Sequence, residues 1–329
     1  MSNLDPHPAE SLCTSLAPPG PAGRVFAARE VPLGGVRDTT VRRTLPQREL
    51  PTVGAWCFLD EFGPSAAAMR VLPHPHTGLQ TVTWPLTGRI RHRDSLGSDL
   101  IVRPGELNLM TGGHGVSHSE FSPADAGGAE GADGGEPLHG LQLWIALPES
   151  ARGGAAAFEH HGDLPQVRRG PLRATVLVGS LAGAASAATV HSPLVGADIS
   201  MAPGTAEVPL DPDFEHAVLV VAGSVAVAGT DTAPGPLLYL GTGRSGLRLT
   251  AHGDARLLLI GGAPFEEELV MWWNFIGRSH EDIARAREEW QRADSRFGRV
   301  AGHGDDRIPA PPLPNARLRP RRRPAPPRW

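Results

Sequence analysis

Two pairs of potential metal ligands, each separated by one residue, constrain this chain more than any other feature. His74 and His76 form the first pair, and His118 and Glu120 form the second. Because successive side chains of a β-strand point to opposite faces, the two members of each pair project to the same side of a strand. If the two strands lie side by side and turn these faces into a barrel, three imidazoles and one carboxylate converge. The spacing therefore predicts a metal site inside a β-barrel.

The composition indicates a soluble protein built mainly of β-strands. Of its 329 residues, 40 are Gly and 33 are Pro, and strong helix-forming runs occur only near the C-terminus. The 31 basic residues are all Arg and face 35 acidic ones, so the formal net charge of −4 argues against a general nucleic-acid surface. The absence of Lys excludes Schiff-base chemistry and Lys-containing phosphate loops. Two cysteines, Cys13 and Cys57, do not indicate a disulfide framework.

Short segments of strand character, punctuated by Gly and Pro, follow one another at the spacing of a small barrel or sandwich. A linker at 149–170 separates them from a second set at about 172–262, which repeats the rhythm but not the ligand pairs. His191 and His216 stand alone there, so no second metal site is expected. The strands of the first half are predicted at about 79–86, 89–94, 100–103, 106–110 and 141–147.

One helix is predicted late in the chain. Ser279 and Asp282 form a capping box, and apolar residues then recur at steps of three and four until Gly298. This stripe is expected to pack against a barrel wall rather than to bind a partner. Its members are Ile283, Ala286, Trp290, Ala293 and Phe297.

Three segments have compositions that do not build a core. Residues 1–23 form a leader, 124–136 an acidic Gly-rich loop, and 299–329 a Pro- and Arg-rich tail. The loop is expected to be a surface insertion, and the alternative is a lid over the site. The tail is expected to be a solvated extension, and the alternative is a segment that binds an acidic partner electrostatically. No apolar run approaches the roughly 20 residues that span a bilayer, and no signal peptide is evident, so a cytoplasmic location is expected.

Several stretches resemble the pirin family of the cupin superfamily. They are LPQRELPTVGAWCFLDEFGP, PHPHTGLQTVTWPLTG, PGELNLMTGGHGVSHSE, LHGLQLWIALP and GGAPFEEELVMWWNFIGRS. The resemblance covers roughly 25–298 and implies an all-β bicupin of two double-stranded β-helix barrels with a C-terminal helix outside them. It implies that His74, His76, His118 and Glu120 are the metal ligands. Gln80 stands where many cupins have a ligand Glu, and the pirin pattern takes its carboxylate from Glu120 instead.

The resemblance also gives the expected domains. Between the disordered leader 1–23 and the disordered tail 299–329, residues 24–148 form the metal-bearing barrel, 149–265 a barrel without metal, and 266–298 the closing segment and helix.

Three imidazoles and one carboxylate leave up to two positions of an octahedral shell open, which suits Fe(II) and also admits Mn, Ni, Cu or Zn. Such a site keeps a net positive charge of about one and should attract an enolate or a phenolate. Some pirin-like proteins open the flavonol quercetin with dioxygen. By that resemblance the substrate's 3-hydroxyl binds the metal and loses its proton to Glu120, the catalytic base.

Other residues carry secondary hypotheses. His114 is either a hydrogen-bond partner of the site or an exposed loop residue. Trp56, Trp84 and Phe121 are either walls of a pocket for an aromatic ligand or part of the barrel core.

A metal- or redox-responsive regulatory protein without turnover is the alternative to the enzyme, because it needs the same residues. Its partner would be a regulatory protein, whereas the enzyme's would be a small aromatic substrate. Neither reading requires nucleic acid, a membrane or an organic cofactor. A closed bicupin has little unpaired edge, so a monomer is expected.

Overall fold

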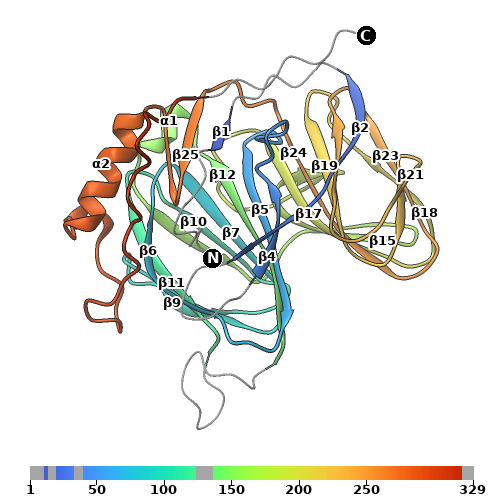
Figure 1. Ribbon diagram of the computed structural model, residues 1–329. Helices are drawn as coiled ribbons and strands as arrows, with labels where there is room; N and C mark the ends of the chain where they lie inside the picture. Colours follow the sequence, from blue (N-terminus) through green and yellow to red (C-terminus); the bar gives the residue numbers. More distant parts are fainter. Residues whose placement is uncertain (1–10, 14–19, 33–39, 124–135, 321–329) are drawn as a thin grey trace.

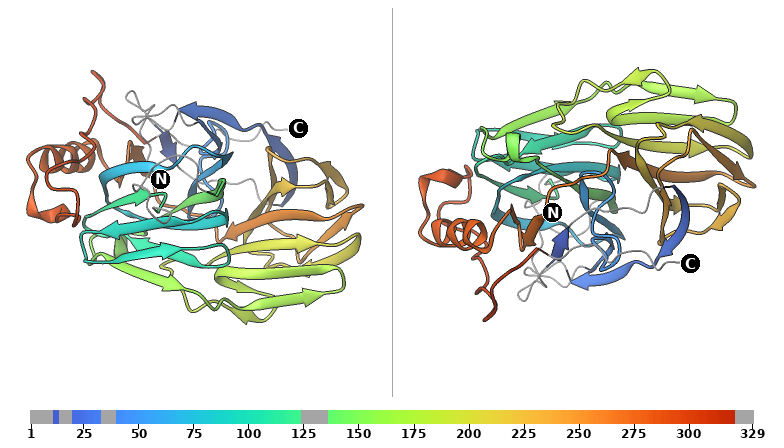
Figure 2. Two further views of the ribbon diagram at one scale, coloured as in Figure 1. Left: turned by 90° about the horizontal axis from the view of Figure 1, so that it is seen from below. Right: turned by 90° about the horizontal axis from the view of Figure 1, so that it is seen from above.

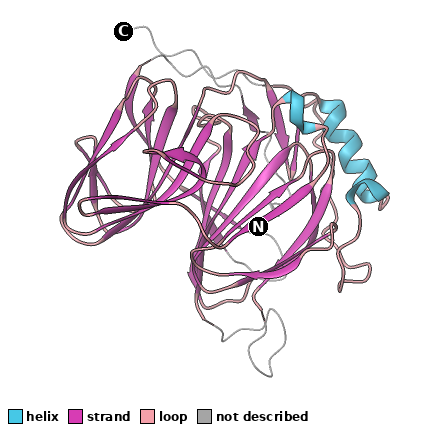
Figure 3. Ribbon diagram, turned by 180° about the vertical axis from the view of Figure 1, so that it is seen from behind, coloured by secondary structure: helices cyan, strands magenta, loops and turns pink. Residues whose placement is uncertain are grey.

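Two antiparallel β-barrels side by side make up most of the protein (Figure 1). In the computed structural model the residues described are 11–13, 20–32, 40–123 and 136–320. The helices lie together at one end of the molecule, beside the first barrel (Figure 3). The all-β bicupin fold with a C-terminal helix is thus confirmed. None of the described helices is long and apolar enough to cross a membrane.

The N-terminal barrel joins a long sheet and a four-stranded sheet. In spatial order the long sheet contains β13 (Ala157–His161), β10 (Leu107–Thr111), β7 (Leu79–Thr87), β12 (Leu138–Ala146), β5 (Trp56–Ser65), β4 (Thr40–Leu45) and β3 (Arg29–Pro32). The four-stranded sheet contains β6 (Arg70–His76), β11 (Val116–Phe121), β8 (Ile90–Asp94) and β9 (Asp99–Val102).

The C-terminal barrel repeats this plan, but aliphatic side chains such as Val208, Val220 and Leu249 fill its interior. Its large sheet contains β14 (Gln166–Arg169), β15 (Leu172–Leu181), β17 (Leu194–Met201), β24 (Ala255–Gly262), β19 (Glu215–Ala222), β22 (Leu237–Gly241) and β2 (Pro21–Phe26), with β16 (Ala184–Ala185) beside β15. The smaller sheet contains β18 (Gly204–Pro209), β23 (Gly246–Ala251), β20 (Val225–Val227) and β21 (Thr230–Thr232).

The large sheets of the two barrels share one apolar core. The indole N–H of Trp56 lies 3.1 Å from the carbonyl oxygens of Val195 and Gly261, and that of Trp84 donates to Asp198 at 3.1 Å. Gly196 permits this approach, because a Cβ there would lie 2.8 Å from the Trp56 ring. Trp56 and Trp84 therefore join the barrels, as the core alternative has it, and do not line a ligand pocket.

The predicted helix is α2 (His280–Gln291), and its cap is confirmed, since the Ser279 side chain accepts from the backbone N–H of Asp282 at 3.1 Å. It ends earlier than expected, because Ala293 has a φ of 54° and the chain then turns into the 3₁₀ helix η1 (Ser295–Phe297). Its buried face packs on the hairpin of β25 (Leu269–Trp272) and β26 (Phe275–Gly277), which pairs with β1 (Ser11–Cys13). The short α1 (Glu149–Arg152) follows β12.

The structure corrects the expected segment boundaries. The leader contributes β1, and β2 crosses to the edge of the C-terminal barrel, where it pairs with β22 (Figure 2). The expected linker contains α1, β13 and β14, and β13 extends the sheet of the first barrel. The tail is not disordered over 299–320, where it lies against α2: Trp290 Nε1 donates to Ile308 O at 2.8 Å. Residues 124–135 of the acidic loop and 321–329 of the tail lie outside the described residues.

Candidate metal centre

The two ligand pairs lie on neighbouring strands, as the spacing predicts. β6 and β11 pair antiparallel, with His118 opposite His74. The ring centroid of His74 lies 5.1 Å from that of His76 and 4.3 Å from that of His118. One nitrogen of each of these three rings lies within 4.8 Å of the other two, and all three side chains are fully buried. The geometry is that of a cluster able to share one ion.

The hydrogen bonding of His74 fits a metal ligand. Its Nδ1 lies 2.9 Å from the carbonyl oxygen of Leu72, so Nδ1 carries the proton and donates it. Nε2 then carries a lone pair, and this buried atom has no hydrogen-bond partner among the described residues. A ring nitrogen fixed by a backbone carbonyl on one side and left bare on the other is what metal-binding histidines show.

The other two rings present nitrogens to each other. Nε2 of His76 lies 3.1 Å from Nε2 of His118, inside the same buried cluster. Burial lowers the pKa of His76 to about 3, and burial together with the neighbouring imidazoles lowers the pKa of His118 well below its usual value. Burial, with His76 beside it, does the same to His74. The three rings are therefore neutral at ordinary pH, which is the form that binds a metal.

Glu120 lies at the same centre but is offset along β11. The pairing of β11 with β6 is irregular between His118 and Glu120, so the carboxylate does not continue the simple alternation. It forms a second group with His118 and His92, again with ligand atoms within 4.8 Å of one another. Thr83 Oγ1 lies 3.3 Å from Oε1 of Glu120 and 3.1 Å from Oε1 of Gln142, so its one proton serves these two acceptors, and the hydroxyl helps to fix the carboxylate.

A chain of hydrogen bonds that the sequence reasoning missed leads away from His118. Its Nδ1 lies 3.4 Å from Nδ1 of His92, and Nε2 of His92 lies 3.1 Å from Oδ2 of Asp94. A carboxylate only accepts, so His92 donates through Nε2 and accepts through Nδ1. His118 then donates through Nδ1 and keeps a lone pair on Nε2, toward the cluster. The signal was present, because His92 and Asp94 form a third pair of this spacing, H-x-D, in β8.

Aromatic rings surround the cluster on the barrel side. Trp144 lies edge-on to His76 at 5.3 Å and stacks on Phe58 at 4.1 Å, while Phe158 stacks on His92 at 4.4 Å. Trp144 Nε1 and Asn108 Nδ2 are buried and have no partner among the described residues. The unused indole N–H of Trp144, beside the ring of His76, is a donor that a polar group of a ligand at the cluster could use.

The remaining candidates lie elsewhere. Gln80 Nε2 donates to Thr111 Oγ1 and to the carbonyl of Thr189, both at 2.9 Å, and its buried Oε1 has no partner among the described residues. Phe121 packs against His303, with ring centroids 5.2 Å apart. His114 is exposed, and its carbonyl accepts from Arg296, which agrees with the loop alternative. Trp144 and Phe158 are the aromatic residues that contact histidines of the site, whereas Phe58, which stacks on Trp144, belongs with Trp144 to the shared apolar core.

The two barrels and the buried His and Glu cluster in the first of them define a bicupin with one candidate metal centre. Comparison with known proteins narrows this class. The Pirin family model matches residues 38–145, and the model of the Pirin C-terminal cupin domain matches residues 196–298. The chain belongs to the pirin family.

Relatives and solved structures agree with this membership. A Pseudomonas aeruginosa protein named provisionally as a quercetin 2,3-dioxygenase is 45% identical over 292 residues, which are 87% of this chain and 89% of that protein. The crystal structure of a quercetin 2,3-dioxygenase from Acinetobacter baumannii has a TM-score of 0.82 and 40% identity, covering 89% of this chain and 96% of that one. A bacterial pirin from Escherichia coli in complex with nickel(II) shares the fold, with a TM-score of 0.59, 19% identity and coverage of 74% and 100%.

Proposed function

We propose that this pirin-like cupin binds one divalent metal, Fe(II) in the first place, through His74, His76, His118 and Glu120, and that it oxidises a flavonol such as quercetin with dioxygen. The observation that carries the metal is the bare Nε2 of His74, buried beside the neutral rings of His76 and His118. The relatives named for quercetin 2,3-dioxygenase support the substrate class. The E. coli pirin with nickel(II) keeps Ni among the alternatives, with Mn, Cu and Zn.

A bound divalent ion would supply a Lewis acid that favours the ionised 3-hydroxyl of the flavonol and brings dioxygen to it. Glu120 would accept the hydroxyl proton, since its carboxylate is buried at the cluster and receives the Thr83 hydroxyl. Trp144 and Phe158, which contact His76 and His92, would border the planar rings and exclude water. The unused N–H of Trp144, whose ring lies beside His76, would bind a polar edge of the ligand.

The test is anaerobic reconstitution of the purified protein with Fe(II), followed by oxygen-electrode traces with a panel of flavonols. His76→Ala removes a ligand, and His191→Ala, an exposed histidine in the second half, is the matched control. Oxygen uptake that needs both iron and flavonol, persists in the control and is lost in His76→Ala supports the proposal. Stoichiometric iron without oxygen uptake overturns the enzyme and leaves the metal-responsive regulator. Absence of metal binding overturns the metal centre itself.

A further inference from the structure

The C-terminal segment contacts the face of β11 opposite the candidate ligands. The prediction of a disordered tail did not foresee this contact. Ser117 Oγ donates to the carbonyl of Phe297 at 2.9 Å. Ser119, which lies between His118 and Glu120, has its Oγ 2.9 Å from Nε2 of His303. The Phe121 ring packs on the same imidazole. Three successive outward residues of one strand therefore contact residues 297–303.

The same segment reaches the other ligand-bearing strand. The backbone N–H of Ile308 donates to the carbonyl of Pro73, the residue before His74, at 2.8 Å. β6 is the last strand of its sheet, and Pro73 and Pro75 remove two of its N–H donors. An edge strand with so few donors is weakly fixed by its own ladder. The hydrogen bond from the Ile308 N–H to Pro73 supplies, on the open edge of β6, a contact that a neighbouring strand would otherwise make.

The segment is itself anchored to α2. Trp290 Nε1 donates to Ile308 O at 2.8 Å, Arg307 donates to the carbonyls of Trp290 and Gln291, and Gln291 Oε1 accepts from the N–H of Ala310 at 3.0 Å. Arg307 also lies over the Trp290 ring, 4.7 Å from its centroid. The position of the segment is thus set by the C-terminal end of α2, through the buried Trp290 and the exposed Gln291.

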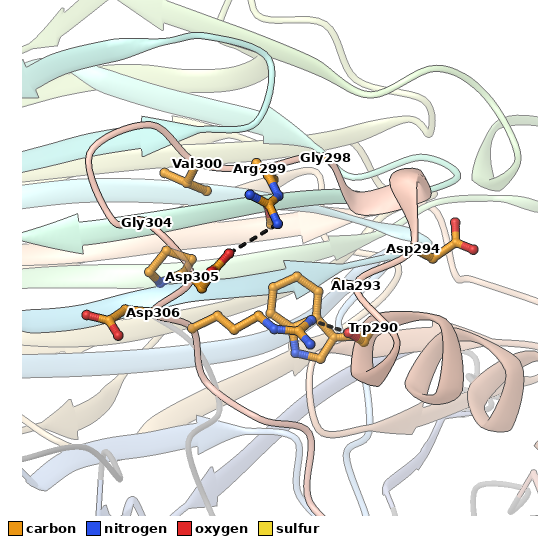
Figure 4. Close-up of a pocket in the computed structure, with 12 residues that line it drawn as sticks. Trp290, Ala293, Asp294, Gly298, Arg299, Val300, Gly304, Asp305 and Asp306 are labelled. Carbon is orange, nitrogen blue, oxygen red and sulfur yellow. Dashed lines mark hydrogen bonds and ion pairs between the residues drawn. The ribbon is translucent and has the colours of Figure 1, made fainter.

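Between these anchor points the segment stands away from the barrel wall. Figure 4 shows the resulting pocket, of about 290 Å³, with Arg299 and Asp305 paired across its rim. The segment holds the barrel through a few hydrogen bonds and through the side chain of Ile308, which packs against the apolar cluster that includes Val71 and Ile90. The pocket lies between Pro73 and Ser117 of the barrel, Trp290 and Ala293 at the helix end, and Val300 and Arg307 of the segment.

We infer that residues 297–308 act as an outer clamp, which fixes the two ligand-bearing strands from the side opposite the metal and so sets metal affinity. His303 and Ile308 are its positioning residues. β11 needs such support because its pairing is irregular between His118 and Glu120. The inference rests on the proposed metal centre, since it concerns the placement of those ligands.

The test compares two matched pairs of variants of the full chain. His303→Leu removes the hydrogen bond to Ser119, whereas His303→Gln keeps a polar group near the position of Nε2. Ile308→Pro removes the N–H that reaches Pro73, whereas Ile308→Ala keeps this N–H and loses only the side-chain packing, which Ile308→Pro loses as well. Co(II) is titrated into each apo protein against a chelating competitor, the visible absorption of the bound Co(II) is recorded as a report on ligand geometry, and thermal unfolding is measured separately.

The clamp predicts that His303→Leu and Ile308→Pro weaken Co(II) binding by about tenfold, the lower end of the effect of removing supporting partners of metal ligands, and shift the Co(II) spectrum. His303→Gln and Ile308→Ala should retain the wild-type affinity and spectrum. Unchanged affinity and spectrum in all four would overturn the inference, as would a loss of thermal stability with an unchanged spectrum. Wild-type protein that binds no Co(II) would instead overturn the proposed metal centre, and the inference with it.

Discussion

Asp94→Asn tests the site sharply, because it reverses a hydrogen-bond chain without changing its shape. Oδ1 of Asp94 accepts from the backbone N–H groups of Leu96 at 2.9 Å and Ser98 at 3.0 Å, and Oδ2 accepts from His92 at 3.1 Å. An asparagine keeps its single oxygen on the two backbone donors and turns its NH₂ group toward His92. The ring of His92 must then accept where it donated.

The reversal spreads to the metal ligands. His92 carries its proton on Nδ1 and points it at Nδ1 of His118, 3.4 Å away. His118 has to accept there and takes its proton on Nε2, the nitrogen 3.1 Å from Nε2 of His76. A protonated nitrogen has no lone pair for a metal. Changing such supporting partners costs about 10–100-fold in metal affinity, or about 1.4–2.7 kcal/mol.

The assay is a Co(II) or Ni(II) titration of apo protein against a chelating competitor at pH 7.5, with thermal unfolding of the same samples. Asp99→Asn is the matched control, because Asp99 is 47% exposed and binds Arg91 at 2.7 Å, outside the barrel. We expect weakened metal binding for Asp94→Asn and wild-type binding for the control. A folded Asp94→Asn protein with wild-type metal affinity would refute the assignment of protons along the chain.

Three further predictions concern single residues. Thr83→Val removes the hydroxyl on Glu120 and should weaken metal binding by about tenfold, with Thr83→Ser restoring it, as measured by the same titration. Burial lowers the pKa of His216 to about 4, so below about pH 6.5 the unfolded chain binds a proton at this residue that the folded chain does not bind. The free energy of unfolding should therefore fall by about 2 kcal/mol through His216 when the pH is lowered from 7.5 to 5. Urea unfolding of His216→Leu at the two pH values should lack this part of the decrease. Trp56→Phe loses the N–H shared by two carbonyls of the second barrel and should lower the free energy of unfolding by about 1–3 kcal/mol, again by urea titration.

The strand alternation rule predicted the central cluster because it is a local rule. His74 with His76, and His118 in the neighbouring strand, needed only the period of two and one correct pairing of strands. The same rule applied to His92 and Asp94, but nothing in the sequence states that β8 lies next to β11. The offset of Glu120 depends on an irregular pairing, which no alternation pattern records.

The errors at the chain ends and in the expected linker have a different origin. β2, β13 and the segment 299–320 carry weak signals of their own and are ordered by partners distant in the sequence. Ile308 is the clearest case, since its N–H and carbonyl are satisfied by Pro73 and by Trp290. The composition of a segment indicates whether the segment can form a core by itself. It does not show which distant strands or helices the segment can pack against.

The two barrels share a topology but use their interiors in opposite ways, and this difference explains where the chemistry lies. Aliphatic side chains fill the C-terminal barrel, whereas the N-terminal barrel buries His74, His76, His92, His118 and Glu120, groups that cost free energy to remove from water unless they are paired. The first barrel has only a smaller apolar cluster of its own, which includes Val71 and Ile90, and it is also stabilised from outside. One wall shares the apolar core with the neighbouring barrel, and the wall that carries the ligands is held by the C-terminal segment. Because these contacts add to the small cluster, part of the interior is left for a polar site.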